Sequence, residues 1–252
     1  MRFADKVVVI TGAGGAVGPP IVARLRGEGA RVVATDKAVP EGAGDDGTVW
    51  VPADLRERGS GKRIVDAALE AFGRVDVLIG NAALATDGDL GAADEDYWAD
   101  DITVNLTANV GLVGAVIPAM REQRSGVIIA VSSVNAHADF GTPIYSAAKA
   151  GLESLMRSVA GAYGPEGIRA NSIVLGTIAT EGWRHRVAKN PEIFENLRAI
   201  FPLRRIGTPD DVASLISFVA SGEASWMTGA SIVLDGGLLI AHPDFRSQVF
   251  GA

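Results

Sequence analysis

The 252-residue sequence predicts a single α/β domain, in which helices cover both faces of a doubly wound parallel sheet. Short apolar runs of strand length alternate along the chain with longer stretches of helical spacing. The strand candidates are continuously apolar, which is typical of parallel strands that are buried on both faces. No linker-like segment or internal repeat interrupts this alternation, so we expect residues 1–252 to form one domain.

The alternation predicts seven strands and five helices. Runs rich in valine and isoleucine place the strands at residues 6–11, 31–35, 49–51, 75–80, 127–131, 168–174 and 231–234. Helical spacing, with glycine or proline at several helix ends, places the helices at residues 19–27, 62–72, 94–124, 144–163 and 208–220. Residues 181–203 break the alternation, and we expect this insertion to act as a lid over a substrate site.

The composition narrows the classes of function. A net charge of −7 repels phosphate backbones, so we do not expect a nucleic-acid partner. The chain has no cysteine and only three scattered histidines, so we expect no metal site. The apolar run near the N-terminus is too short for a signal peptide, which favours a cytoplasmic protein.

Residues 102–120 carry no charge and have the length of a membrane span. The same segment contains two threonines, two asparagines and a proline, which a lipid environment would penalise. We therefore expect a buried or subunit-contacting helix and no membrane partner. This helix and the C-terminal strand together suggest a homo-oligomer.

A glycine-rich turn, Thr-Gly-Ala-Gly-Gly-Ala-Val-Gly at residues 11–18, follows the first strand. Glycines at a strand-to-helix turn let the backbone approach a pyrophosphate, which the helix N-terminus then binds. Asp36 ends the second strand, where a carboxylate can bind both hydroxyls of an adenosine ribose and repel a 2′-phosphate. These features predict NAD as the cofactor, and Lys37 beside Asp36 leaves NADP as the alternative.

Tyr145 and Lys149 stand four residues apart in the predicted helix 144–163, so they share one helix face. A neighbouring ammonium group and a positive nicotinamide ring would stabilise the phenolate and lower the pKa of the tyrosine from about 10. The phenol could then exchange a proton with an alcohol or a ketone near neutral pH. The spacing therefore predicts an acid/base pair at the start of this helix.

Several motifs occur in a fixed order along residues 3–240. They are the turn at 11–18, Asp54-Leu55, residues 80–83, Asn105-Leu106, Ser132-Ser133, the Tyr145 and Lys149 pair, and residues 171–180, 228–229 and 235–237. In this order and spacing they resemble the short-chain dehydrogenase/reductase family over nearly the whole chain. The resemblance implies a Rossmann-type fold, hydride transfer between a nicotinamide cofactor and a secondary alcohol or ketone, and assembly as a homotetramer.

The resemblance also implies roles for individual residues. Tyr145 would be the general acid/base, Lys149 would bind the nicotinamide ribose, and Asn105 would hold a water in a proton relay to Lys149. Thr180 and the backbone of Ile178 would bind the carboxamide. The implied cofactor-binding set is Gly12, Gly14, Gly15, Val17, Gly18, Asp36, Asp54, Leu55, Asn81, Ala82, Tyr145, Lys149, Gly176, Ile178 and Thr180.

Two serines are candidates for the residue that hydrogen-bonds the substrate oxygen. The family places this serine 12 or 13 residues before the tyrosine, which fits Ser133 and Ser132 respectively. The second serine of the family's pair is normally catalytic, so we expect Ser133. The alternative for the other serine is a strand-end hydroxyl bonded to the backbone.

Departures from the family pattern leave a second class of function open. Ala16 replaces a glycine of the turn, and Leu175 replaces a proline before Gly176. A non-catalytic dinucleotide-binding sensor or scaffold is therefore the alternative to an enzyme. The expected catalytic residues are all retained, which favours the enzyme: Asn105, Ser133, Tyr145 and Lys149.

Overall fold

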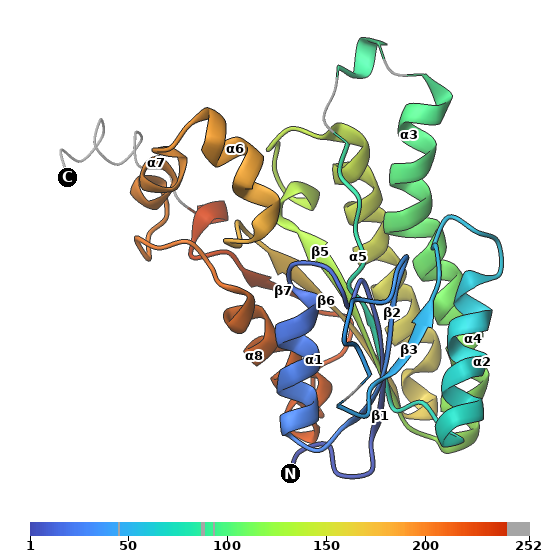
Figure 1. Cartoon of the computed structure of the whole chain (residues 1–252). Coiled ribbons are helices and arrows are strands. Elements are labelled where there is room, and N and C mark those ends of the chain that lie inside the picture. The colour runs from blue at the N-terminus through green and yellow to red at the C-terminus, as the bar shows by residue number, and fades with distance from the viewer. Residues whose placement is uncertain (45, 87–88, 93, 241–252) are drawn as a thin grey trace.

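A computed structural model describes residues 1–240 except 45, 87–88 and 93. Within this range, seven parallel strands form one sheet in the order β3-β2-β1-β4-β5-β6-β7 (Figure 1). Their bounds are β1 Val7–Thr11, β2 Arg31–Asp36, β3 Val49–Pro52, β4 Val77–Gly80, β5 Gly126–Ser133, β6 Ile168–Leu175 and β7 Ser231–Leu234. The strand order reverses between β1 and β4, which makes the sheet doubly wound and confirms the predicted fold class.

Helices cover both faces of the sheet. Their bounds are α1 Gly18–Gly27, α2 Ser60–Phe72, α3 Glu95–Ile102, α4 Ala108–Gln123, α5 Pro143–Tyr163, α6 Arg184–Lys189, α7 Ile193–Ile200 and α8 Pro209–Ala220. Helices α1 and α8 form one layer, and α2, α4 and α5 form the other (Figure 1). Strand β1 lies between them: Val9 packs in the core with α2, α4 and α5, whereas Val8 and Ile10 pack in the core with α1 and α8. Because both faces are buried, the strands need continuous apolar runs.

The predicted helix at 94–124 is interrupted. A π-helical turn, Thr103–Thr107, separates α3 from α4, and the N–H of Ala108 donates to the carbonyl of Thr103. The stretch Trp98–Gln123 is long and apolar enough to cross a membrane. Its inner side chains, including Leu112 and Val116, are nevertheless buried in the core beneath it.

The insertion at 181–203 contains two short helices, α6 and α7, that the sequence pattern did not predict. Its ends are held together, because the N–H of Ala179 donates to Gly207 O at 2.8 Å and the N–H of Gly207 donates to Thr177 O at 3.1 Å. Inside it, the rings of Trp183 and Phe194 lie 5.7 Å apart. The insertion after β6 is therefore a helical segment whose two ends are hydrogen-bonded to each other.

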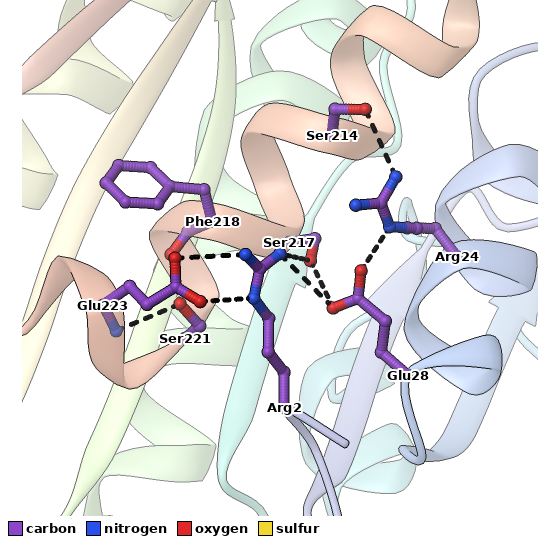
Figure 2. Close-up of polar contacts among 8 residues, drawn as sticks. All are labelled: Arg2, Arg24, Glu28, Ser214, Ser217, Phe218, Ser221 and Glu223. Atoms are coloured by element: carbon purple, nitrogen blue, oxygen red, sulfur yellow. Dashed lines mark hydrogen bonds and ion pairs between the residues drawn. The ribbon is translucent and has the colours of Figure 1, made fainter.

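A polar network joins the N-terminal segment to the layer of α1 and α8 (Figure 2). The guanidinium group of Arg2 donates to both carboxylate oxygens of Glu223, at 2.7 and 3.0 Å. Ser217 of α8 donates to Glu28 at 2.7 Å, and Glu28 also pairs with Arg24 of α1. The network lies at the C-terminal ends of α1 and α8, so it fixes these two helices to each other and leaves the glycine turn at the start of α1 untouched.

Candidate active site

A cleft of about 350 Å³ lies where the strand order reverses, at the C-terminal ends of β1, β2 and β4. This is the position at which open α/β sheets bind ligands. Nine residues of the implied cofactor set line it: Gly12, Gly15, Val17, Asp36, Asp54, Leu55, Asn81, Ala82 and Thr180. The structure thus brings together five segments that are distant in sequence.

The remaining glycines of the implied set shape the surroundings of the cleft without lining it. A side chain at Gly18 would collide with the carbonyl of Ala13, so this glycine allows α1 to start tightly after the turn. A side chain at Gly176 would lie 2.7 Å from the Cα of Asp235. The need for glycine at both positions follows from backbone packing and does not require a ligand.

Gly12 has a φ of +64°, and a Cβ there would lie 2.7 Å from the Cα of Ala82. The ends of β1 and β4 can therefore approach only if this residue is glycine. Asn81 strengthens the same junction, because its amide donates to the carbonyls of Thr11 and Gly12, each at 3.0 Å. Ala16, which departs from the family pattern, lines the cleft directly.

Charges of both signs meet at one end of the cleft. Asp36 accepts from the N–H of Gly14 at 3.0 Å and from that of Lys37 at 2.8 Å, so its carboxylate also supports the glycine turn. The Arg56 guanidinium, together with a backbone N–H and Lys37, holds the pKa of Asp54 at about 2. Arg56 was not predicted from the sequence; its spacing of two residues from Asp54 was the available signal. This end of the cleft is therefore lined by two carboxylates and the Lys37 ammonium, and Arg56 pairs with Asp54 beside it.

Helix α5 carries the expected acid/base pair. Lys149 is 1% exposed, and its ammonium donates to Val131 O at 2.7 Å. Its Nζ lies 5.4 Å from the centre of the Tyr145 ring. Burial lowers the pKa of Lys149 to about 7, because the charged form loses its hydration.

The pKa of Tyr145 is raised in the folded chain, whereas the sequence analysis expected it to be lowered. Burial raises it, a hydrogen bond with Ser133 lowers it, and the negative charge of Asp101 raises it further. The net effect on the pKa is upward, because burial is the largest of these three effects. The protein alone therefore keeps the phenol protonated.

The two candidate serines point to different partners. Ser133 donates to Asn135 Oδ1 at 2.9 Å and lies within hydrogen-bond reach of Tyr145. Ser132 is buried and donates to Glu153 Oε1 at 2.7 Å. The structure therefore brings Ser133 beside the phenol and engages Ser132 elsewhere.

Glu153 is a buried carboxylate that the sequence analysis did not single out. Besides Ser132, it accepts from Ser231 of β7 at 2.6 Å, and it contacts the imidazole of His137 at 3.1 Å. It follows Lys149 by four residues, which places both side chains on one face of α5. That spacing was a signal in the sequence, but it did not reveal that the face is buried.

Asn105 lies on the π-helical turn and is fully buried. Its amide donates to Leu84 O at 2.5 Å and to Asp101 O at 2.9 Å, and its carbonyl oxygen accepts from the N–H of Leu84 at 3.3 Å. π-Helical turns are frequent at functional sites. This side chain joins the loop after β4 to the helix layer that packs on α5.

The chain is similar to known oxidoreductases over almost its full length. Residues 12–239 match the family described as Enoyl-(Acyl carrier protein) reductase. The chain is 38% identical to L-rhamnose 1-dehydrogenase (NAD(P)(+)) of Azotobacter vinelandii, over 95% of this chain and 99% of the relative. It is 32% identical to 7alpha-hydroxysteroid dehydrogenase of Bacteroides fragilis, over 96% and 97%. The crystal structure of an oxidoreductase of the short chain dehydrogenase/reductase family from Burkholderia thailandensis matches with a TM-score of 0.91 and 39% identity, over 98% of both chains.

The buried Lys149 makes stability depend on pH. Its pKa of about 7 in the folded chain lies below the ordinary 10.5, so its contribution to stability is complete above pH 10.5 and is lost as the pH falls through 7. We expect Lys149→Met to be more stable than the parent at pH 6 by about 1–3 kcal/mol, because it removes a buried unpaired charge. Urea denaturation at pH 6, 8 and 10 measures the difference, which should shrink as the pH rises.

The exposed Lys62 supplies the matched control. Lys62→Met should show no comparable gain at pH 6. A gain for Lys149→Met that is the same at all three pH values would contradict the role given to burial of the charge.

Proposed function

Because the chain belongs to the short-chain dehydrogenase/reductase family and is an oxidoreductase of that family, we propose that it transfers a hydride between NAD(H) and a secondary alcohol or its ketone, with Tyr145 as general acid/base. The observation that carries the proposal is the close approach of Ser133, Tyr145 and Lys149 at the C-terminal end of β5, on the same edge of the parallel sheet as the cleft. Bound NAD(H) would give or accept the hydride at nicotinamide C4.

The protein groups perform the proton transfer. The raised pKa of Tyr145 keeps its proton in place for donation to a ketone oxygen, and the Ser133 hydroxyl would hydrogen-bond the same oxygen. In the direction of alcohol oxidation, Tyr145 must first lose its proton, which a positive nicotinamide ring nearby would favour. With a pKa of about 7, Lys149 can pass a proton on in either direction, and Asn105 would hold the next water of that path.

The substrate is proposed to be a hydroxylated ring compound. Three relatives, one of them from Sinomonas cyclohexanicum, are named for L-rhamnose, a 7alpha-hydroxysteroid and trans-4-hydroxycyclohexanecarboxylate, and each of these carries a ring hydroxyl group. We propose that the segment of α6 and α7 closes over such a substrate. The support is the position of this segment in the chain. It follows Thr180, which lines the cleft, and it ends before Gly207, which is hydrogen-bonded to Thr177 and Ala179.

We propose NAD as the cofactor, because Asp36 lines the cleft and its carboxylate would repel a 2′-phosphate. The alternative, NADP, is favoured by Lys37, which lines the same end. The proposed enzyme is a cytoplasmic homotetramer. Its support is the exposed apolar surface of Val110 on α4, Val233 on the edge strand β7 and Trp226, which is 100% exposed.

Replacing Tyr145 tests the reaction. In Tyr145→Phe the ring keeps its packing but loses the proton-transferring hydroxyl, so NADH formation from a panel of ring alcohols should fall by a factor of at least about 10² to 10⁴. NADH binding, followed by fluorescence, should remain within about twofold of the parent. Full turnover by Tyr145→Phe would overturn the mechanism.

The paired serines supply a matched control for the same assay. Ser133→Ala should lose most turnover and keep its stability. Ser132→Ala should keep more turnover but lose about 1–2 kcal/mol of stability, because Glu153 is left with a missing donor in a buried site. A parent protein that binds NADH and converts no alcohol or ketone would favour the sensor or scaffold instead.

Cofactor choice is tested by titrating NADH and NADPH into the parent, Asp36→Ser and Lys37→Ala. The parent should bind NADH at least about tenfold more tightly, since a carboxylate faces the 2′ position. Asp36→Ser should reduce this preference and Lys37→Ala should increase it. Tighter binding of NADPH by the parent would establish the NADP alternative.

The assembly is tested by light scattering at several protein concentrations. We expect a mass of four chains of 26.1 kDa each. Trp226→Ser should shift the distribution toward smaller species, because the exposed indole would be buried between subunits. A monomer at every concentration would refute the tetramer.

A further inference from the structure

The side chain of Asn135 bridges the end of β5 and the start of α5. Asn135 lies in the short 3₁₀ turn Val134–Ala136 that follows β5. Its amide NH₂ group donates to Gly141 O at 3.0 Å and to Thr142 Oγ1 at 3.3 Å, just before α5 begins. On its other side, its Oδ1 lies 2.9 Å from the hydroxyl oxygen of Ser133. Asn135 therefore contacts a residue of the proposed reaction, although that reaction gives Asn135 itself no role.

The contacts of Asn135 fix the direction in which the Ser133 hydroxyl group points. A carbonyl oxygen can only accept a hydrogen bond, so the amide group that faces Gly141 O is the NH₂ group. The other amide atom, Oδ1, can also only accept, so Ser133 donates its single proton to it. The backbone N–H of Asn135 donates to the same serine oxygen at 3.3 Å. The proton of Ser133 is thus committed to Asn135, and only the lone pairs of its oxygen remain for other partners.

This direction affects the phenol of Tyr145, which lies within hydrogen-bond reach of Ser133. Ser133 can lower the pKa of Tyr145 only by donating a hydrogen bond to the phenolate, and here its proton is turned to Asn135. In this arrangement the serine oxygen can accept a bond from the neutral phenol, which favours the protonated form. If the hydroxyl group turned towards Tyr145, the phenolate would gain a charge-assisted hydrogen bond and the proton would be lost more easily.

The charged groups around the phenol belong to other residues. On α5, the Nζ of Lys149 lies 5.4 Å from the centre of the ring, and on α3 the charge of Asp101 raises the pKa of the phenol. His137, in the loop after β5, contacts Glu153 of α5 at 3.1 Å. Replacing Asn135 by an uncharged residue leaves these four groups in place. A change in the pKa of the phenol in such a variant therefore comes from the serine hydroxyl group beside it.

We propose that Asn135 is a positioning residue, which keeps the proton of Ser133 turned away from Tyr145 until a substrate oxygen displaces that hydrogen bond. The proposal rests on the proposed function and adds a control over when Tyr145 loses its proton. Before the substrate binds, the phenol stays protonated and ready to donate to a ketone oxygen. When the substrate is bound, the Ser133 hydroxyl group leaves Asn135 and donates to the substrate oxygen instead.

The test follows the pH dependence of alcohol oxidation at saturating NAD⁺, because this direction requires the phenolate. The profile of kcat/KM reports the enzyme before the alcohol binds, whereas that of kcat reports the complex. Asn135→Ala removes the acceptor, so the Ser133 proton can turn to the phenolate and the midpoint of the kcat/KM profile should fall by about one pH unit. The midpoint of the kcat profile should stay, since Ser133 has already left Asn135 in the complex.

Two further variants separate this role from a role in holding the loop. Thr142→Val removes the hydroxyl acceptor of the Asn135 amide but leaves the contact with Ser133, so it should keep the parent's kcat/KM midpoint. Asn135→Asp keeps an acceptor oxygen for Ser133, so its midpoint should not fall below that of the parent. An unchanged or raised midpoint in Asn135→Ala, or an equal fall in Thr142→Val, would overturn the proposal.

The absorbance of the phenolate titrates Tyr145 without turnover. Subtracting the titration of Tyr145→Phe, with NAD⁺ present, isolates this phenol among the three tyrosines of the chain. Asn135→Ala should lower its pKa in the parent and should change nothing further in Ser133→Ala, where the hydroxyl group through which Asn135 acts is missing. An equal fall in the Ser133→Ala background would contradict the proposal.

The two readouts distinguish failure of this inference from failure of the proposed function. A lower phenolate pKa in Asn135→Ala, together with no turnover of any alcohol by the parent, would support Asn135 and count against the proposed reaction alone. Turnover by the parent, with the same kcat/KM midpoint and the same phenolate pKa in Asn135→Ala, would leave the reaction standing and remove the role of Asn135.

Discussion

The attachment of α5 to the sheet is the interaction on which the rest of the site depends. Two buried polar contacts hold it: Lys149 donates to the carbonyl of Val131 on β5, and Glu153 accepts from Ser132 on β5 and Ser231 on β7. These contacts lie one helical turn apart on the same face of α5. Because they fix both the rotation and the height of the helix, Tyr145 meets Ser133 at the end of β5 and not at some other level of the sheet.

The topology of the sheet supplies the second half of the site. The reversal of strand order between β1 and β4 leaves a cleft that no crossover helix covers. Gly12 and Asn81 close the junction beneath this cleft, one by lacking a side chain and the other by bonding two carbonyls. The glycine turn therefore serves two purposes, since its backbone lines the cleft while its close packing holds β1 against β4.

Two charged side chains near the candidate active site are buried. Lys149 and Asp101 are both inaccessible to water, and neither has an ion-pair partner in the described residues. Burial lowers the pKa of Lys149 from 10.5 to about 7 and raises that of Tyr145 above its ordinary 10, so the two pKa values move apart. Burial thus favours the uncharged form of both groups: Tyr145 keeps its proton for donation, and Lys149, with a pKa near neutral pH, can give or take one.

The sequence by itself determined the seven strands, the placement of helices on both faces of the sheet and the position of the glycine turn after β1. These features depend on local patterns, namely apolar runs, helical spacing and glycine at a strand-to-helix turn, and such patterns can be recognised without knowing the fold. Helical spacing also placed Tyr145 and Lys149 on one face, whereas Ser133 beside them followed from the resemblance to the family, with Ser132 as the alternative.

Only the tertiary structure decided the features that depend on what packs against each residue. The π-helical turn around Asn105, the engagement of Ser132 by Glu153 and the unpaired oxygen of Asp101 involve partners that are distant in sequence or that depend on a side chain's buried environment. The direction of the Tyr145 pKa shift has the same origin, since spacing indicated an ammonium nearby but could not reveal that burial would outweigh it. Local spacing determines which residues share a face, whereas the free energy of a charge depends on the burial and partners that the whole fold provides.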